Sequence, residues 1–374
     1  MLRARWRKRA MQGLTEDRIS QRQLLALGFV SILSPAIRLL PEYVAGVAGR
    51  GAWIVPIGAA VPVVLLALFS HWALKNRRDG EGMTEMLIRS IGKGAGRIVA
   101  ILIALWAIVY AGFILRVSAE RLIAAAYPKG HILFFLVPTL IVSFIAAMGK
   151  VKSLGRTAEA YVIVISFLLV AILVFAAADI KIENLIPLTA RDVLPMGEGV
   201  LAVVDVVAVY GYFTFLYGHV KKETGEKRKL LVWTGATLLV LFGIMVTTVG
   251  TLSAWLVTKM ENPFFAMVKN VSFFGIVERI EAVLLGVWVV TDFIYLASLL
   301  SVVFEIFSCA VPGVKRMAVS VPAAVGVLAV SLIMAGSTYE IDFFSRRLIP
   351  GVNLGIMLIV LPAALLIGKI RRKI

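Results

Sequence analysis

Charged and aromatic residues inside one very apolar segment are the first candidates for chemistry. The segment "ERIEAVLLGVWVVTDFIYLASL" places Glu281, Trp288, Asp292 and Tyr295 on one stripe at helical spacing. Because a charged group is costly in hydrocarbon, this stripe is expected to face other helices of a bundle. Two roles are open for Asp292, which falls near the middle of the segment: it binds a ligand or a proton, or it is a protonated or paired structural carboxylate.

A second set of polar residues lies in the apolar stretch 98–127. Trp106 and Tyr110 are four residues apart, so they share one helix face. Arg116 and Glu120 have the same spacing. We interpret these two as a structural ion pair, because opposite charges at this spacing neutralise each other.

The first apolar stretch, "LLALGFVSILSPAIRLLPEYVAGVAG", contains residues that disturb a helix. Pro35 lacks an amide proton, and its ring clashes with the preceding turn. We predict that the helix is interrupted at Ser34-Pro35 and exposes backbone groups to a small polar ligand; a proline kink buffered by neighbouring helices is the alternative. Arg38 can make a bidentate contact with a carboxylate, either on a ligand or on Asp205 or Asp292.

Composition places the chain in a lipid bilayer. Of its 374 residues, 60% are hydrophobic and only 16% are charged, which is more apolar surface than a soluble domain of this length buries. A membrane helix needs about 20 apolar residues, and ten stretches qualify: 23–43, 52–74, 98–127, 131–148, 158–178, 200–219, 230–257, 281–310, 317–335 and 348–367. The stretches 83–91 and 263–277 are too short to span, so we predict interfacial or re-entrant helices there.

The positions of lysine and arginine predict the orientation in the membrane. Basic clusters such as "RARWRKR", "KNRRDG", "KKETGEKRK" and "KIRRK" recur at every second loop, which is typical of the cytoplasmic side. We therefore predict basic cytoplasmic tails at 1–22 and 368–374 and an outer loop at 179–199. The net charge of +17 is explained by insertion and by contact with anionic membrane lipid. A nucleic-acid partner is excluded, because its binding face would need the charges on one surface.

Ten spans divide into two halves of five, residues 23–178 and 200–367. Matching helices of the two halves are five spans apart, an odd number, so the halves cross the membrane in opposite orientations. Transporters with such inverted repeats hold the substrate between paired broken helices. The stretch that matches the first span, "VLAVVDVVAVYGYFTFLYGH", carries Asp205 and then Tyr210-Gly211, where glycine permits unwinding. The sequence thus predicts an all-α polytopic membrane protein with ten transmembrane helices, a 5+5 inverted repeat, and helices 1 and 6 interrupted.

Patterns typical of enzymes are not found in the sequence. His71, His131 and His219 are too scattered for a metal site or a relay, and Cys309 is the single cysteine. No glycine-rich phosphate loop or serine-centred elbow occurs in a suitable context. We expect no catalytic residues, no metal and no cofactor.

Several motifs give the chain a resemblance that covers nearly its whole length: "ISQRQL", "LSPAIRLLP", "RGAWI", "LRVSAERL", "GRTAEAY", "HVKK" and, most specifically, "VERIEAVLLGVWVVTDF". The chain resembles the endospore germination permeases, the B subunits of germinant receptors, in the amino acid, polyamine and organocation transporter superfamily. The resemblance implies a LeuT-like fold, a place in the spore inner membrane, and recognition of a nutrient that is often an amino acid. It also implies assembly with a larger A subunit and a lipid-anchored C subunit.

The resemblance also implies a ligand site on four helices: Ser34, Pro35 and Ala36 as the unwound part of helix 1, Trp106 and Tyr110 in helix 3, Tyr210, Gly211 and Thr214 in helix 6, and Thr291 and Tyr295 in helix 8. Candidates for gating, proton binding or ion pairing are Arg38, Arg116, Glu120, Glu159, Asp205, Glu281 and Asp292. This sequence departs from the family pattern at several of these positions. Relatives commonly have glycine with small residues at 34–35, an apolar residue at 38 and an uncharged residue at 292. We therefore do not infer the ligand of this protein from the ligands of its relatives.

Two functions remain open at this stage. In the first, the protein is a receptor subunit in which nutrient binding between helices 1, 3, 6 and 8 shifts a conformational equilibrium that partner subunits read. In the second, it is an independent proton-coupled amino-acid transporter with Glu159, Asp205 or Asp292 as proton carrier. One fold serves both functions, so the sequence does not decide between them.

Overall fold

Helices form nearly all of the structure, a computed structural model that describes residues 17–127, 129–186, 193–270, 280–334 and 338–373. The first half contains α2 (Gln21–Arg38), α3 (Leu40–Ala48), η1 (Gly49–Ile54), α4 (Val55–Gly58), α5 (Ala60–Asn76), α6 (Met83–Ile91), α7 (Lys93–Ala126), α8 (Leu133–Met148) and α9 (Val151–Ala177). The second half contains η2 (Ile182–Asn184), α10 (Val193–Ala208), α11 (Tyr210–Phe213), η4 (Thr214–His219), α12 (Glu226–Leu252), α13 (Ala254–Val257), α14 (Pro263–Asn270), α15 (Ile280–Ala310), α16 (Arg316–Ile333), α17 (Thr338–Phe343), η5 (Phe344–Leu348), α18 (Ile349–Leu354), η6 (Gly355–Val360) and α19 (Leu361–Ile370).

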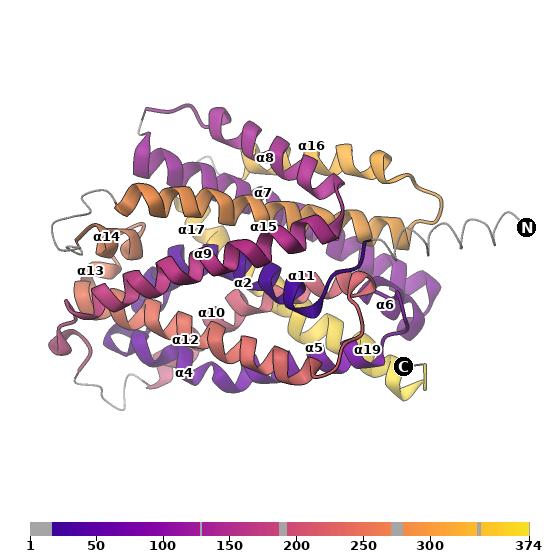
Figure 1. Ribbon diagram of the computed structural model, residues 1–374, viewed down its shortest axis with the longest axis horizontal. Helices are drawn as coiled ribbons and strands as arrows, with labels where there is room; N and C mark the ends of the chain where they lie inside the picture. The colour runs from indigo at the N-terminus through magenta and orange to yellow at the C-terminus, as the bar shows by residue number, and fades with distance from the viewer. Residues whose placement is uncertain (1–16, 128, 187–192, 271–279, 335–337, 374) are drawn as a thin grey trace, which may run out of the picture.

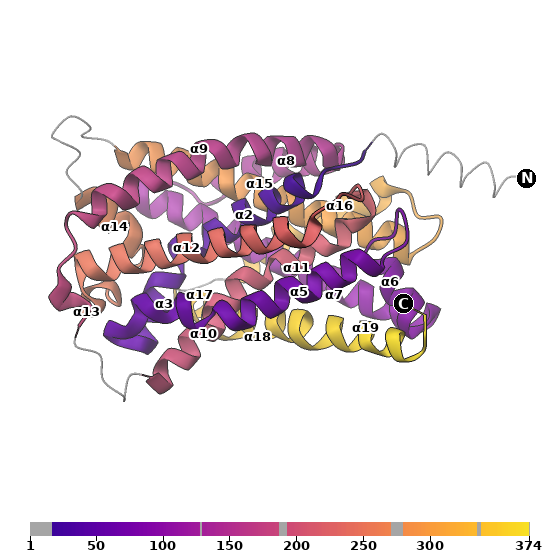
Figure 2. The same cartoon turned by 60° about the horizontal axis from the view of Figure 1, so that its bottom comes forward.

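The long helices run side by side along one axis (Figure 1). In both views α2 lies between α9 and α12 (Figures 1 and 2). The helices α7, α8, α15 and α16 group along the upper edge of Figure 1. We call the end at which α2 begins and α19 ends the termini end, and the end that carries α14 the α14 end. The largest fully buried side chains include Trp288, Tyr212, Tyr217 and Tyr295, so the core lies where α11, η4 and α15 meet the other helices.

Eight helical stretches of the described chain are long and apolar enough to cross a membrane. Of the other predicted spans, α8 has 16 residues, and α2 has 18 residues that include Arg22 and Arg38. The total of ten spans therefore stays a prediction. The two short stretches also form helices: α6 has the predicted bounds, and α14 covers residues 263–270 of the second, whose remainder lies outside the described residues.

Helix 1 is interrupted, but not at the predicted place. Ser34, Pro35 and Ala36, which we expected to be unwound, all lie inside α2. The amide of Leu39 still donates to the carbonyl of Pro35 at 2.9 Å, so the helix recovers within one turn of this proline. The prediction of an unwound segment at 34–36 is wrong, and the interruption falls at Leu39.

A second proline explains where α2 ends. Pro41 stands at the start of α3, where its missing amide cannot bond to the carbonyl of Ile37 and its ring would clash with that carbonyl. Proline is well tolerated in the first turn of a helix, because the amide it lacks has no partner there anyway. The chain therefore ends one helix at Arg38 and begins the next at Leu40.

Helix 6 is interrupted as predicted. α10 ends at Ala208, α11 adds a single turn from Tyr210, and the chain continues as the 3-10 helix η4. A Cβ on Gly211 would lie 2.2 Å from Sδ of Met357, so a side chain at this position would displace the end of that methionine. The tenth span also departs from regular helix, because α18 lies between the π-helical segments η5 and η6. Such segments are frequent at functional sites.

Candidate functional site

A cavity of about 190 Å³ lies beside the interruption of helix 1. It is bounded by the α2–α3 junction, α7, α10 and the segment from η5 to α18. Its lining includes Pro35, Leu39, Tyr110, Asp205 and Arg347. We call this space the central cavity.

Asp205 is the ionisable group of α10 that faces the central cavity. Its side chain is buried, with 8% of the residue exposed, and its Oδ1 has no hydrogen-bond partner in the described part of the chain. Hydrogen bonding from the side chain of Asn353 in α18 also acts on this carboxyl group. A buried carboxylate oxygen without a partner is nevertheless costly, since the charged form needs a cation or several hydrogen-bond donors. Asp205 is therefore the group in this cavity best suited to hold an ammonium group or a proton.

An ion pair also lines the central cavity. Arg346 in η5 donates to the carboxylate of Glu42 in α3 at 2.6 Å. The same guanidinium lies 5.9 Å from the ring centroid of Tyr43. This pair joins the second half of helix 1 to helix 10, so an opening of the cavity between these elements would have to break it.

A hydrogen-bonded aromatic cluster packs behind the cavity. The hydroxyl of Tyr295 donates to the hydroxyl of Tyr110 at 2.7 Å, and the rings of Tyr110 and Tyr212 are 5.9 Å apart. Oδ1 of Asn353 in α18 accepts from Tyr212 at 2.7 Å and from the indole of Trp106 at 3.0 Å. Helices 3, 6, 8 and 10 are thus held together by one polar cluster.

Asp292 lies in a separate, buried polar centre. Its carboxylate accepts hydrogen bonds from Ser34 in α2 and from Ser118 and Arg121 in α7. The guanidinium of Arg121 lies 4.7 Å from the ring centroid of Trp288. Both members of the ion pair are almost completely buried, with side-chain exposures of 2% and 3%. Of the two roles open for Asp292, the geometry is that of a paired structural carboxylate.

Arg38 does not make the internal pair that its position suggested. The partner of Asp292 is Arg121, and Nη2 of Arg38 is buried without a hydrogen-bond partner among the described residues. The charged groups that act on Arg38 electrostatically include Arg121, Asp292 and Glu120. A contact between Arg38 and a ligand carboxylate stays a prediction.

The remaining predicted positions are divided among different places. Arg116 and Glu120 form an ion pair at 2.7 Å in α7. Thr291 lies 3.2 Å from the hydroxyl of Tyr161 in α9, and Ala36 is fully buried. The side chain of Glu281 lies outside the described part of the structure.

Three predicted ligand positions in helix 6 face a different space. Tyr210, Gly211 and Thr214 line a cavity of about 30 Å³ next to α5 and α12, which is room for about one water molecule. Glu159 lies at the termini end, where it accepts a hydrogen bond from Gln23 at 3.1 Å. Of the predicted residues whose side chains the structure describes, only Pro35, Tyr110 and Asp205 line the central cavity.

Two groups of functional interest were missed in the sequence. Arg121 and Ser118 are three residues apart and share a face of α7, a spacing that could have indicated a binding pair for a carboxylate. Asn353 follows Pro350 and Gly351 in a short apolar run, and nothing in its local pattern distinguishes it from a loop asparagine.

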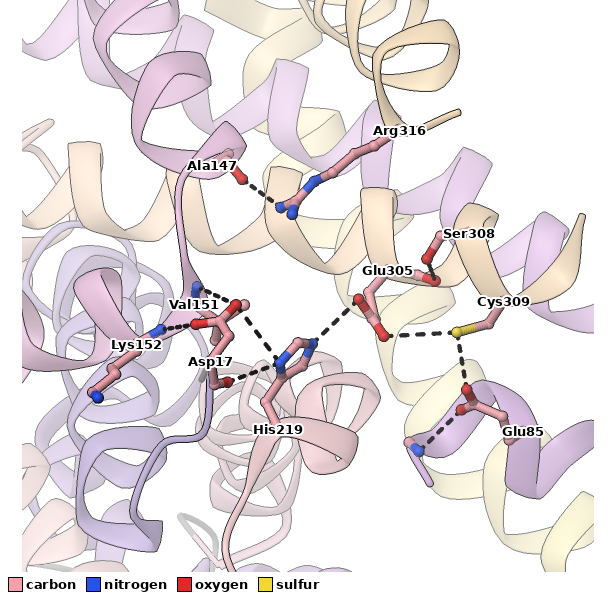
Figure 3. Close-up of polar contacts among 11 residues, drawn as sticks. Asp17, Glu85, Ala147, Val151, Lys152, His219, Glu305, Ser308, Cys309 and Arg316 are labelled. Atoms are coloured by element: carbon pink, nitrogen blue, oxygen red, sulfur yellow. Dashed lines mark hydrogen bonds and ion pairs between the residues drawn. The ribbon is translucent and has the colours of Figure 1, made fainter. Parts of the chain in front are cut away.

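A chain of titratable side chains crosses the termini end (Figure 3). His219 lies with Nδ1 3.1 Å from the carbonyl oxygen of Asp17 and with Nε2 3.3 Å from Oε2 of Glu305. The thiol of Cys309 lies 3.6 Å from Glu305 and donates to Glu85 at 3.0 Å. Burial raises the pKa of the Glu85 carboxyl above its usual range.

Two backbone contacts tie the start of the described chain to this network. The carboxylate of Asp17 accepts from the amides of Val151 and Lys152 at 3.1 and 2.8 Å, so it caps α9 (Figure 3). Ile19 pairs with the segment after η4, since its amide donates to the carbonyl of His219 at 2.8 Å. These contacts fasten the segment before α2 to helices 5 and 6.

This arrangement of helices is shared with two solved structures. MhsT in complex with L-phenylalanine superposes with a TM-score of 0.68 at 14% identity, over 95% of this chain and 99% of that one. Mhp1, a nucleobase-cation-symport-1 family transporter in a closed conformation with bromovinylhydantoin bound, gives a TM-score of 0.59 at 16% identity, over 94% and 78%. The chain thus has the predicted LeuT-like fold, and the eight long apolar helical stretches of its described residues are those of a multi-pass membrane protein.

The family follows from the sequence match. A family model described as spore germination protein matches residues 18–337, so the chain belongs to the spore germination protein family, as the motifs predicted. A comparison with curated protein sequences gives no match.

Proposed function

We propose that this protein is the transporter-like subunit of a nutrient germinant receptor, and that it binds a small amino acid in the central cavity. One observation carries the proposal: the cavity at the interruption of helix 1 contains a buried carboxylate, Asp205, whose Oδ1 lacks a partner among the described residues. An ammonium group would supply the missing cation. The family and the amino acid held by MhsT, L-phenylalanine, support this class of ligand.

The size and polarity of the central cavity fit such a ligand. Its volume of about 190 Å³ exceeds the roughly 150 Å³ that accommodates benzene in an engineered protein cavity. We assign the ligand ammonium to Asp205 and its carboxylate to Arg347, which also lines the cavity. Pro35 and Leu39 supply an apolar wall for the side chain.

Ligand binding would act on a conformational equilibrium. The cavity lies between the two halves of helix 1 and helix 10, which the pair of Glu42 and Arg346 joins. A ligand that binds one arrangement of these elements better than another shifts the population toward it. We propose that A and C subunits read this change in the spore inner membrane, with both termini of this subunit in the cytoplasm.

A thermal-stability screen of the purified protein tests this proposal. The screen would compare amino acids and other nutrients on the parent, on Asp205→Asn and on Asp179→Asn, which removes an exposed carboxylate as a control. We expect saturable stabilisation by one class of amino acid, lost in Asp205→Asn and kept in the control. Stabilisation that survives in Asp205→Asn but is lost in Thr291→Ala would instead favour the site that the family resemblance implies.

A second function, proton-coupled amino-acid transport, is favoured by the network at the termini end. A continuous series of titratable groups runs from Glu85 through Cys309, Glu305 and His219 to Asp17, whose carboxylate lies 3.8 Å from Nδ1 of His219 (Figure 3). Such a series is suited to exchanging protons with one side of a membrane. Uptake of labelled amino acid into proteoliposomes driven by a pH gradient, without partner subunits, would establish this function, and its absence in a protein that binds the ligand would favour the receptor.

A further inference from the structure

The helices α2, α9 and α12 run next to one another (Figure 2). Residues of all three, most of them toward the termini end, line a groove that is open to the outside. Its volume is about 1000 Å³. Arg22 of α2, Arg156 of α9, and Arg228 and Lys229 of α12 line it near the starts of their helices. We call this space the basic groove.

The three helices bring these charges together because they all begin at the same end of the bundle. Arg22 is the second residue of α2, Arg156 lies in the second turn of α9, and Arg228 lies in the first turn of α12. The positive ends of the three helix dipoles add to the same field. The sequence places each cluster separately, and only the fold gathers them around one groove.

The polarity of the basic groove changes along its length. On α9, Ile163 follows Arg156 by two turns, about 10 Å at 1.5 Å per residue, and is 72% exposed. On α12, Val232 follows Arg228 by one turn and is 64% exposed. Both apolar side chains line the groove together with Phe29 of α2. One end of the groove therefore suits an anion, and the rest suits a hydrocarbon chain.

Not all of the positive charge in the groove is neutralised. Arg22 lies 3.9 Å from Glu159, and Lys229 donates to Glu223 at 2.5 Å. Arg156 and Arg228 make no ion pair with any residue of the described ranges. These two arginines, on facing helices, leave an excess of positive charge at the groove's polar end.

We propose that the basic groove is a specific site for an anionic phospholipid. The phosphate of the headgroup lies between Arg156 and Arg228, and an acyl chain follows Ile163 and Val232 along the helices. Basic pockets between transmembrane helices bind anionic headgroups in this manner. A zwitterionic lipid would not neutralise the excess positive charge of the groove. The same positive charge would repel the basic sequence "RARWRKR" near the N-terminus.

The lipid would act on the conformation of helix 1. The groove is formed by Arg22, Leu25, Ala26 and Phe29 of α2 on one side and by α9 and α12 on the others. A lipid that contacts all three helices stabilises the arrangement in which α2 lies against α9 and α12. Anionic lipid is therefore expected to favour the conformation described above, independently of any nutrient in the central cavity.

Native mass spectrometry and thermal melts of the purified full-length protein test this proposal. Phosphatidylglycerol and phosphatidylcholine with the same acyl chains would be added separately to detergent micelles, and glycerol phosphate would serve as the free headgroup. The variants are Arg156→Gln/Arg228→Gln, the matching double lysine variant, and Arg371→Gln/Arg372→Gln as a control that removes two exposed arginines of the C-terminal tail at the same end.

We expect phosphatidylglycerol to bind and to raise the melting temperature more than phosphatidylcholine does. The double glutamine variant should bind it about thirtyfold more weakly, at about 1 kcal/mol for each arginine near an anionic lipid. The double lysine variant and the tail control should retain most of the binding. Equal effects of the two lipids, full binding by the double glutamine variant, or the same stabilisation by glycerol phosphate would overturn the proposal.

Discussion

Breaking the ion pair of Arg121 and Asp292 is expected to destabilise this protein strongly. Removing one partner of a buried ion pair costs about 3–5 kcal/mol, because the other charge stays buried and uncompensated. Asp292→Leu should cost more than Arg121→Met, since it also leaves the hydroxyls of Ser34 and Ser118 without their acceptor, at about 1–3 kcal/mol for each buried orphan. A loss of about 3 kcal/mol lowers the ratio of folded to unfolded protein by more than a hundredfold.

The double variant Arg121→Met/Asp292→Leu separates charge from packing. It removes both charges of the pair, so it should be less destabilised than Asp292→Leu alone, with a coupling energy of at least about 2 kcal/mol. The assay is unfolding in mixed detergent and dodecyl sulfate micelles, followed by the helical circular dichroism signal. Arg116→Met serves as the control, because its pair with Glu120 is more exposed and should contribute less than the buried pair.

Two results would refute this reasoning. If the free energy of unfolding of each single variant stays within about 1 kcal/mol of the parent's, breaking the pair does not leave a buried, uncompensated charge. If the cost in the double variant equals the sum of the single costs, Arg121 and Asp292 do not interact energetically.

Three further predictions concern residues outside the central cavity. Burial raises the pKa of Glu85, so protonated Glu85 stabilises the folded parent at low pH, and this stabilisation is lost as the pH rises through the folded pKa. Glu85→Gln should therefore lose less stability with rising pH than the parent does. Identical slopes of melting temperature against pH would contradict this. Asp17→Ala should cost about 1 kcal/mol in the unfolding assay through loss of its cap on α9, more than the exposed control Asp79→Ala. Gly28→Ala should cost about 1–3 kcal/mol in that assay by overpacking, because its Cβ would lie 2.6 Å from a tyrosine ring of α11, whereas Gly235→Ala, with open space around it, should not destabilise.

The hydrophobic pattern predicted the helices well because long apolar runs have few alternatives in a bilayer. The predicted span 281–310 and the observed α15 (Ile280–Ala310) differ by one residue, and the short amphipathic α6 has its predicted bounds. The interruption of helix 1 was placed one turn too early because the sequence offers two prolines. Only the hydrogen bond from Leu39 to Pro35 shows that the second one, Pro41, ends the helix.

The candidate site was predictable only in part, because local spacing does not say which helix faces meet. Asp205 and Tyr110 were recognised as polar groups in apolar spans, and both line the central cavity. Arg38 was predicted as a possible partner of Asp292, because it lies in a helix that contains prolines. The pair is made instead by Arg121 from a helix far away in the sequence, and only the packing of α7 against α15 brings it there.

The most direct test of the account is the affinity of the amino acid that stabilises the protein best, measured for the parent and for Asp205→Asn by equilibrium binding of labelled ligand. Truncating one partner of a buried charged contact costs about 2 kcal/mol or more, so the variant should bind at least about thirtyfold more weakly. The control Asp179→Asn should bind as the parent does. Unchanged affinity in a well-folded Asp205→Asn protein would contradict the assignment of the ligand ammonium to Asp205 and, with it, the central cavity as the nutrient site.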